Sequence, residues 1–189
     1  MKHYAMVIDQ SRCVGCMACI AACVQENQVP FENFRTRVLE ITKGKFPKLR
    51  TEFRPELCNH CDNAPCVMAC PTGASYKRED GIVMIDRDKC VGCKACIAAC
   101  PYDARYINEE HGFADKCTFC LHRLKKDLEP ACVATCIGKS RIFGDLSDKD
   151  SEVSRLLAEN ESRVRLKAAG TKPRVFYIKR YPTKQIEEV

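Results

Sequence analysis

The chain has 189 residues and a formal net charge of +6, and 16 of its residues, about 8.5%, are cysteine. This length suggests one domain, or two small domains that share a core. Without cysteine the apolar fraction falls from 46% to about 38%, so we expect metal ligation by cysteine to help hold the chain together. No apolar run approaches the ~20 residues that cross a bilayer, and residues 1–10 show neither a secretory signal nor a twin-arginine pair.

In the first third of the chain we expect mostly strands. Residues 3–9 are predicted to form a strand, and the Ala-rich segment 19–25 a short helix. Two further strands are predicted at 37–42 and 49–53, with a turn at Lys43-Gly44-Lys45 between them.

Two similar hairpins are predicted next. The first joins 74–77 to 82–86 through a turn at 79–81, and the second begins with a strand at 105–108 and turns near 110–112.

Towards its end the chain carries a helix, a strand and a polar tail. The helix is predicted near 148–159 with Asp and Ser caps, and the strand at 175–178. The tail after Tyr181 is expected to be exposed. Because no Ser/Gly-rich linker divides the chain, we expect one compact unit.

The cysteines form four groups of four, which is an internal repeat. Each group opens with a C-x2-C pair and closes with x3-C. Group I is Cys13, Cys16, Cys19, Cys23; group II is Cys58, Cys61, Cys66, Cys70; group III is Cys90, Cys93, Cys96, Cys100; and group IV is Cys117, Cys120, Cys132, Cys136.

This spacing is that of bacterial two-cluster ferredoxins, in which the fourth cysteine ligates the other cluster. Pro71 and Pro101, which follow groups II and III, complete the pattern and predict that these groups form one module. By symmetry, groups I and IV form a second module that encloses the first in sequence. The predicted ligand sets for four [4Fe–4S] clusters are Cys58/Cys61/Cys66/Cys100, Cys90/Cys93/Cys96/Cys70, Cys13/Cys16/Cys19/Cys136 and Cys117/Cys120/Cys132/Cys23.

We therefore expect an α+β fold of two interleaved bacterial-ferredoxin-like modules, with β-hairpins and short helices around the clusters. The outer module comprises residues 1–57 and 101–189, and the inner module residues 58–100. Four clusters with their thiolates carry eight negative charges, which would leave the protein near −2. This removes the argument from basic charge for binding nucleic acid.

Three other interpretations of the cysteines fit less well. Structural zinc sites combine separated C-x2-C pairs, whereas two groups here read C-x2-C-x2-C. Disulfides belong to exported chains. Buried structural thiols give no account of the regular spacing.

The segments around the cysteines resemble the four-cluster iron–sulfur subunits of the dimethyl sulfoxide reductase superfamily, with the nearest likeness among polysulfide reductases. The segments that carry the resemblance are 4–9, 53–56, 70–76, 99–106, 116–124, 130–133, 143–146 and 173–177. Cys93 stands where some relatives have Trp and a [3Fe–4S] centre, so the resemblance implies four [4Fe–4S] clusters. Ile137 stands where relatives usually have Pro. Separately, the short link between groups III and IV favours the branch of the family that acts on sulfur compounds.

The resemblance implies an electron-transfer subunit that is not an enzyme on its own. It would relay electrons between a polytopic membrane anchor with a quinol site and a molybdopterin catalytic subunit that holds Mo or W, acting on polysulfide or a related sulfur compound. It further implies a peripheral membrane complex, on the periplasmic face by co-export with a twin-arginine partner, or on the cytoplasmic face. Direct binding of nucleic acid and a membrane span of its own are not expected.

Two other functions remain open from the sequence. One is a stand-alone polyferredoxin that serves a hydrogenase or formate enzyme, and the other is a zinc-scaffolded binding protein. No residues show a catalytic arrangement. His60 and His122, beside cluster ligands, either tune potentials through hydrogen bonds or pack on the surface, and Lys94 is either a tuning charge or a solvated one.

Overall fold

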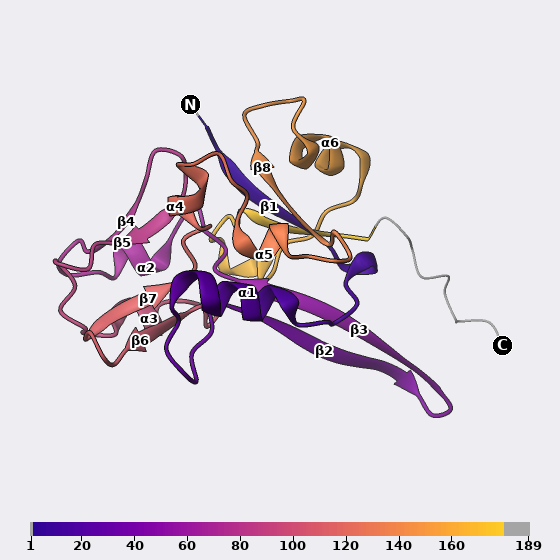
Figure 1. Ribbon diagram of the computed structural model, residues 1–189, viewed down its shortest axis with the longest axis horizontal. Helices are drawn as coiled ribbons and strands as arrows, with labels where there is room; N and C mark the ends of the chain where they lie inside the picture. Colours follow the sequence, from indigo (N-terminus) through magenta and orange to yellow (C-terminus); the bar gives the residue numbers. More distant parts are fainter. Residues whose placement is uncertain (1, 180–189) are drawn as a thin grey trace.

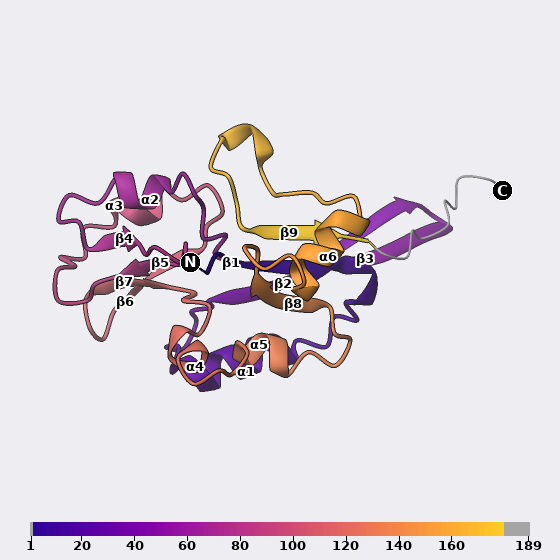
Figure 2. The same cartoon turned by 90° about the horizontal axis from the view of Figure 1, so that it is seen from above.

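A three-stranded sheet forms the centre of the computed structural model, which describes residues 2–179. The order is β8-β1-β9, where β1 (Tyr4–Asp9) runs antiparallel to β8 (Arg141–Asp145) and parallel to β9 (Val175–Ile178). The first strand of the chain therefore lies between two strands from its last third, as Figures 1 and 2 show. The predicted strands at 3–9 and 175–178 are confirmed, whereas the sequence analysis did not anticipate β8.

The two faces of β1 serve different parts of the core, because side chains of a strand point alternately to opposite faces. Ala5 and Val7 pack with Val153 and Leu156 of helix α6 (Glu152–Glu159). Met6 and Ile8 instead belong to the cluster that contains cysteine side chains of groups I, II and IV. One face of the sheet thus supports the C-terminal helix and the other supports the cysteines. Ser151 caps α6: its side-chain oxygen accepts a hydrogen bond from the backbone N–H of Ser154, which confirms the predicted Ser cap.

A long hairpin, β2 (Thr36–Lys45) and β3 (Lys48–Leu57), projects from the body of the molecule (Figure 1). Its ladder extends from the Thr36–Leu57 pair to the Lys45–Lys48 pair, so both strands are longer than predicted. The turn predicted at Lys43-Gly44-Lys45 is wrong, because these residues belong to β2 and the chain reverses at Phe46-Pro47. Gly44 is instead needed inside the strand, where its φ is 92° and a Cβ would clash with the carbonyl oxygen of Lys48.

The two smaller hairpins are confirmed close to their predicted positions. β4 (Ser75–Lys77) pairs with β5 (Val83–Ile85), and β6 (Arg105–Asn108) pairs with β7 (Phe113–Lys116). Each follows the last cysteine of a group, so the internal repeat of the sequence is also a repeat of structure.

Short helices carry the later cysteines of the groups. The first, α1 (Ala18–Asn27), confirms the predicted helix at 19–25 and packs against α5. Likewise α2 packs against α3, so helices of groups I and IV meet and those of groups II and III meet. The remaining helical elements are η1 (Gln10–Arg12), α2 (Pro65–Met68), α3 (Ala95–Ala98), α4 (Leu121–Leu124), α5 (Ala131–Ala134) and η2 (Lys167–Ala169).

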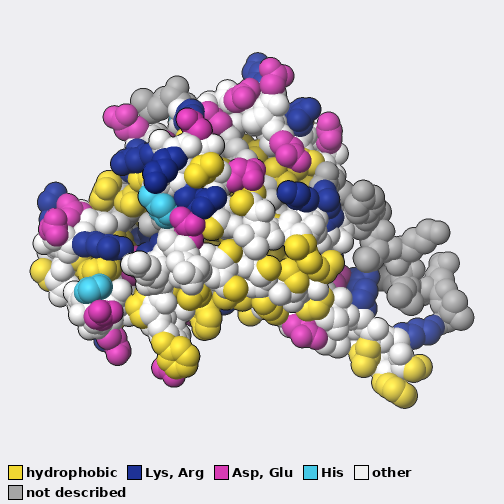
Figure 3. Space-filling model, in the orientation of Figure 1, with side chains coloured by type: hydrophobic (Ala, Val, Ile, Leu, Met, Phe, Trp, Pro, Cys, Tyr) yellow, Lys and Arg dark blue, Asp and Glu magenta, His cyan; other side chains and the backbone are white. Residues whose placement is uncertain are grey.

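Within residues 2–179, no helix combines the length and the apolar character that crossing a membrane requires. Apolar side chains nevertheless reach the surface in places, and Figure 3 shows them gathered at the tip of the β2–β3 hairpin. There Phe46 is 88% exposed and Leu49 56% exposed. The predicted polar tail after Tyr181 lies outside the described residues.

Candidate functional site

All sixteen cysteines lie in the described part of the chain, and all are free thiols. Their exposure differs along the molecule. Cys16 and Cys93 are exposed, whereas nine thiols are buried: Cys19, Cys23, Cys58, Cys61, Cys66, Cys96, Cys117, Cys120 and Cys132. The other five have intermediate exposure. These thiols therefore form a largely internal site that reaches the surface at two cysteines.

Groups I and IV meet around two separate cavities. Cys13, Cys16 and Cys19 of group I line one cavity together with Cys136 of group IV. Cys23 of group I lines the other together with Cys117, Cys120 and Cys132. In each cavity the four lining thiols are those predicted to ligate one cluster, with the fourth cysteine contributed by the partner group.

Burial and the other thiols of the same predicted set shift the pKa values of these cysteines. Burial, followed by repulsion from the Cys132 and Cys120 thiols, raises the pKa of Cys23 to about 12. Burial also raises the pKa of Cys13, and the neighbouring thiols Cys19 and Cys136 add to the shift. A thiol whose neighbours are thiolates titrates late, because like charges disfavour its ionisation.

Groups II and III also approach one another. Burial raises the pKa of Cys61 to about 12, and the Cys58, Cys66 and Cys100 thiols contribute to the shift. These four are again one predicted ligand set. The thiols of the remaining set contact backbone groups instead: Cys70 Sγ accepts the N–H of Ser75 at 3.3 Å, and Cys90 Sγ accepts the N–H of Ala114 at 3.5 Å.

Neighbouring sets of four come close to one another. Cys58 is among the thiols that raise the pKa of Cys117, after burial and Cys23. Cys19 is among those that raise the pKa of Cys132 to about 11, where burial again dominates. The predicted Cys58 set therefore adjoins the Cys117 set, which adjoins the Cys13 set. Cys58, Cys66 and Cys96 all act electrostatically on Arg105, so the predicted Cys90 set lies next to the Cys58 set, at the other end of the series.

The surroundings of the sulfur atoms suit thiolate ligands of iron. Backbone N–H groups of Ser75, Phe119 and Ser140 donate to the Sγ atoms of Cys70, Cys117 and Cys136 at 3.3–3.4 Å. N–H donors stabilise an ionised sulfur, and Fe–S clusters depend on such hydrogen bonds for their potentials. Among the described residues, no three His, Cys, Asp or Glu side chains gather closely enough to share a single metal ion. A cubane takes one thiolate at each of four irons, and each of the two cavities between groups I and IV offers four thiols.

His60 is fully buried and does not pack on the surface. Its ring stacks on Phe119 with centroids 3.8 Å apart, and its Nδ1 accepts the backbone N–H of Val83 at 3.1 Å. Burial holds the pKa of His60 well below its usual value, so the ring is neutral and Nε2 carries the hydrogen. No acceptor for that hydrogen occurs among the described protein atoms.

The other polar residues singled out from the sequence lie at the surface. His122 contacts Glu26 at 2.7 Å, and Arg123 contacts the same carboxylate at 2.8 Å, which ties α4 to α1. Lys94 is exposed, between Cys93 and Cys96. These contacts are those of a solvated surface rather than of buried groups at the thiols.

Three buried cations that the sequence analysis assigned no role lie against the thiols: Arg105, Lys116 and Arg141. The Arg105 guanidinium donates from Nη2 to Cys66 Sγ at 2.8 Å, and that of Arg141 donates to Cys19 Sγ at 3.4 Å. The internal repeat could have pointed to Arg105 and Arg141, because each stands five positions after the last cysteine of its group.

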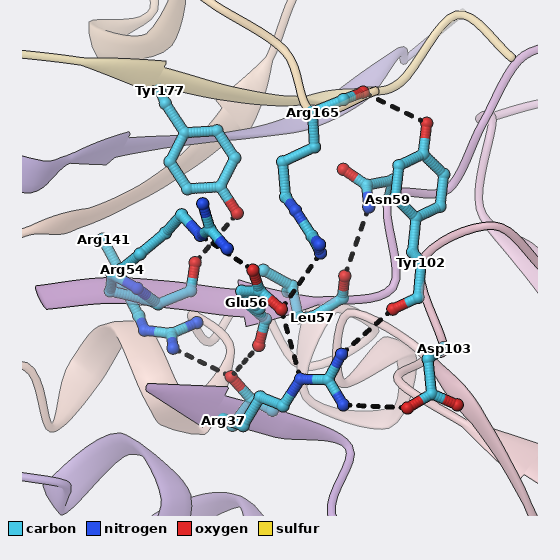
Figure 4. Close-up of polar contacts among 12 residues, drawn as sticks. Arg37, Arg54, Glu56, Leu57, Asn59, Tyr102, Asp103, Arg141, Arg165 and Tyr177 are labelled. Carbon is cyan, nitrogen blue, oxygen red and sulfur yellow. Dashed lines mark hydrogen bonds and ion pairs between the residues drawn. The ribbon is translucent and has the colours of Figure 1, made fainter. Parts of the chain in front are cut away.

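A hollow between the start of β2, the end of β3 and the loop after group III is lined by charged residues, among them Arg37, Glu56 and Asp103. Figure 4 shows the ion pairs of Glu56, whose nearly inaccessible carboxylate receives Arg37, Arg54 and Arg165 at 2.8–3.2 Å. Arg37 also contacts Asp103 at 3.1 Å. These ion pairs fasten β3 to the loop after group III and to the segment before β9, so the hollow is a structural junction.

Comparison with protein families matches two overlapping parts of the chain to 4Fe-4S dicluster domains, one over residues 12–74 and the other over residues 49–146. Each such domain holds two clusters. The cofactors are therefore four [4Fe–4S] clusters. The chain has sixteen cysteines, which is the number of ligands that four clusters require.

Curated proteins with a similar sequence include B subunits of several reductases. The B subunit of tetrathionate reductase from Salmonella typhimurium is 48% identical over 180 residues, covering 93% of this chain and 72% of that protein. A putative iron–sulfur subunit of dimethyl sulfoxide reductase from Halobacterium salinarum is 45% identical, covering 94% and 79%. The B subunit of polysulfide reductase from Wolinella succinogenes is 43% identical, and the match covers 94% of both proteins.

Proposed function

We propose a defined place in a respiratory complex for this chain, which belongs to the iron–sulfur B subunits of the dimethyl sulfoxide reductase family and is close to the B subunit of polysulfide reductase. It is an electron-transfer subunit of a reductase and does not catalyse a substrate conversion on its own. In our proposal it relays electrons between a quinol-reactive membrane subunit and a molybdopterin catalytic subunit. When bound, the clusters supply one-electron chemistry, while the protein spaces, shields and tunes them.

The proposed ligands are the four exchanged sets of cysteines. The proposal is supported by the two cavities lined by Cys13, Cys16, Cys19 and Cys136 and by Cys23, Cys117, Cys120 and Cys132. If the sets are correct, Cys136→Ser and Cys16→Ser must abolish or alter the same electron paramagnetic resonance (EPR) signal, although 120 positions separate the two residues in sequence. Loss of different signals in the two variants would refute the exchange.

The proposed relay is supported by a difference in solvent exposure between the cysteines at the ends of the series and those in the middle. Cys16 and Cys93 are exposed, and they belong to the two terminal sets, whereas Cys58, Cys61 and Cys66 in the middle are buried. Electrons then enter and leave at the ends, and the protein shields the middle from solvent.

Apolar side chains around both exposed cysteines favour docking of a partner at each end. Val14 is 59% and Ile137 70% exposed beside the Cys16 set, and Val91 is 68% exposed beside Cys93. Exposed apolar patches of this kind commonly mark protein–protein contacts. We propose that one end meets the catalytic subunit and the other end meets the membrane subunit.

We propose a sulfur compound as the terminal substrate. Tetrathionate and polysulfide appear in the names of two relatives at 48% and 43% identity, and the link between groups III and IV is short. From the family resemblance we also propose a peripheral position at the membrane, on the periplasmic side after co-export of the folded subunit with its catalytic partner. The cytoplasmic side is the alternative.

Anaerobic purification of the tagged chain from its own host in mild detergent tests this proposal. We expect a species that contains a large subunit with molybdopterin, a membrane subunit and sixteen irons per copy of this chain. A chain that purifies alone with sixteen irons would contradict the partners and support a stand-alone polyferredoxin. Colourless protein with single metal ions would contradict the clusters themselves.

A further inference from the structure

Arg105, Lys116 and Arg141 are buried cations, and we call them the junction cations because each lies between two of the proposed ligand sets. Their exposed fractions are 5%, 1% and 2%, respectively. Charged side chains are seldom buried without a compensating charge, because their desolvation is costly. The hydrogen-bond partners and neighbouring thiols of these three residues therefore indicate which groups their positive charge stabilises.

Arg105 lies between the two ligand sets of the inner module. Its Nη2 donates to Cys66 Sγ at 2.8 Å and to Ser75 Oγ at 2.9 Å. Cys66 and Cys58 belong to one proposed set and Cys96 to the next, and all three thiols act electrostatically on the guanidinium.

Arg141 occupies the equivalent position in the outer module. Its Nη2 donates to Cys19 Sγ at 3.4 Å and to Thr36 Oγ1 at 2.8 Å. The thiols that act on it are Cys132, from the adjoining set, and Cys19. Each arginine therefore contacts the third cysteine of one group and faces the third cysteine of the other.

Lys116 lies where the two modules meet. Its Nζ donates to the carbonyl oxygens of Val83, in the inner module, and of Cys117, in the outer module. Burial lowers the pKa of Lys116, whereas the Cys58 and Cys117 thiols, one from each of the two middle sets, favour its charged form. The three junctions of the series thus hold one buried cation each.

The arginines also have donors to spare. Nε and Nη1 of Arg105 and Nη1 of Arg141 are buried and have no hydrogen-bond partner among the described protein atoms. A buried N–H without an acceptor is costly, so these groups are expected to find one when the site is complete. The sulfur atoms of a bound cluster are acceptors in the right part of the molecule.

We infer that each junction cation raises the reduction potentials of the two clusters that flank it. Reduction adds one negative charge, which a buried cation and its N–H···S hydrogen bonds stabilise. Because the two middle sets each adjoin two junction cations and the terminal sets only one, the three residues favour electrons in the middle of the relay. The inference rests on the ligand sets of the proposed function.

Redox titration of the full-length chain with its clusters, followed by EPR spectroscopy, tests this inference. Arg105→Gln is expected to lower two of the four midpoint potentials, and Arg141→Gln is expected to lower the other two. Lys116→Gln should lower one potential from each of these pairs. This overlap does not depend on assigning any signal to particular cysteines beforehand.

Lys94→Gln is the matched control, since Lys94 also stands inside a cysteine group but is exposed. It should leave all four potentials within error. Arg105→Lys and Arg141→Lys, which keep the charge and lose the planar fork, should hold potentials closer to wild type than the Gln variants do. If Arg105→Gln or Arg141→Gln loses iron, the matching Lys variant takes its place: a smaller lowering of the same two potentials is expected, and a shift in the other two overturns the inference.

The two possible failures differ in their readout. Loss of different EPR signals in Cys16→Ser and Cys136→Ser would contradict the proposed ligand sets. Sixteen irons together with unshifted potentials, or equal shifts of all four, would overturn the inference and leave the proposed relay intact.

Discussion

At the scale of single residues, Glu56 is a buried acid that pairs with three arginines. Its carboxylate is 2% exposed and lies within 3.2 Å of three guanidinium groups. Removing one partner of a buried ion pair usually costs about 3–5 kcal/mol. Here the cost should be smaller, because Arg37 is 38% and Arg54 34% exposed and water can solvate them once they are unpaired.

We predict that Glu56→Gln destabilises the folded chain by about 2 kcal/mol, which corresponds to roughly 4–8 °C in Tm for a chain of this size. Thermal unfolding under anaerobic conditions, followed by circular dichroism, measures the shift. Glu161→Gln is the control, because Glu161 pairs with Arg163 while both are about 80% exposed. It should change Tm by less than about 2 °C, and equal shifts in the two variants would contradict the role given to Glu56.

At the scale of elements, the loops that hold the first two cysteines of a group depend on glycine. Gly92 has a φ of 65°, and a Cβ there would lie 2.5 Å from the carbonyl oxygen of Gly112 in the β6–β7 turn. Gly73, which follows the last cysteine of group II, has a φ of 66°, but a Cβ would meet nothing within 4 Å. The two positions share the left-handed backbone and differ in the space around it.

Gly92→Ala should therefore lower Tm and iron content, whereas Gly73→Ala should incur only the backbone cost of about 1 kcal/mol. Iron per chain after anaerobic purification, together with Tm, distinguishes the two. Equal losses in both variants would mean that the backbone conformation alone, and not the clash with Gly112, determines the effect.

The β2–β3 hairpin is an element whose stability should depend on pH. Burial opposes ionisation of Glu52, yet hydrogen bonds from Lys43 and Lys179 hold its pKa at about 2, below the ordinary 4.5. Since the folded state lowers this pKa, the contribution of Glu52 is complete above pH 4.5 and is lost as the pH falls towards 2.

We predict that amide hydrogens of residues 43–52 exchange faster in Glu52→Gln than in wild type above pH 4.5, and that the ratio of rates approaches one as the pH falls towards 2. Comparing variants at each pH cancels the intrinsic pH dependence of exchange. Glu40→Gln, an exposed acid of the same hairpin, is the control. A ratio that stays constant over this range would contradict the assignment.

At the scale of the whole molecule, the β8-β1-β9 sheet joins the ends of the chain to the cysteine groups. Val175 of β9 is fully buried, in the same cluster as Met6, Cys58 and Cys117. Its side chain therefore contributes both to the sheet and to the walls around the thiols.

Val175→Ala should cost about 2 kcal/mol, or roughly 4–8 °C in Tm, through lost burial and the cavity that remains. Val91→Ala removes the same atoms from a side chain that is 68% exposed, and should shift Tm by less than about 2 °C. Similar shifts in both variants would show that the C-terminal strand adds little to the fold of the complete chain.

Local patterns in the sequence determined a large part of this structure. The spacing of the sixteen cysteines indicated four clusters, because ligand spacing along a chain limits which metal centre the chain can wrap. Strands β1, β6 and β9 and helix α1 were also predictable, since side-chain alternation and helix propensity act within a few residues. The turn of the long hairpin was misplaced because Gly44 suggested a turn where a strand needs close backbone approach.

The tertiary structure decided what depends on distant partners. The sequence did not indicate that β1 pairs with β8 and β9, because its hydrophobic pattern shows which faces are buried but does not name the strands beside it. Nor did it indicate that Arg105, Lys116 and Arg141 are buried between thiol groups, since a charged residue is expected at the surface until the fold surrounds it with compensating charge. Composition and spacing therefore determined the cofactor, and the packing of remote segments determined the environment in which it works.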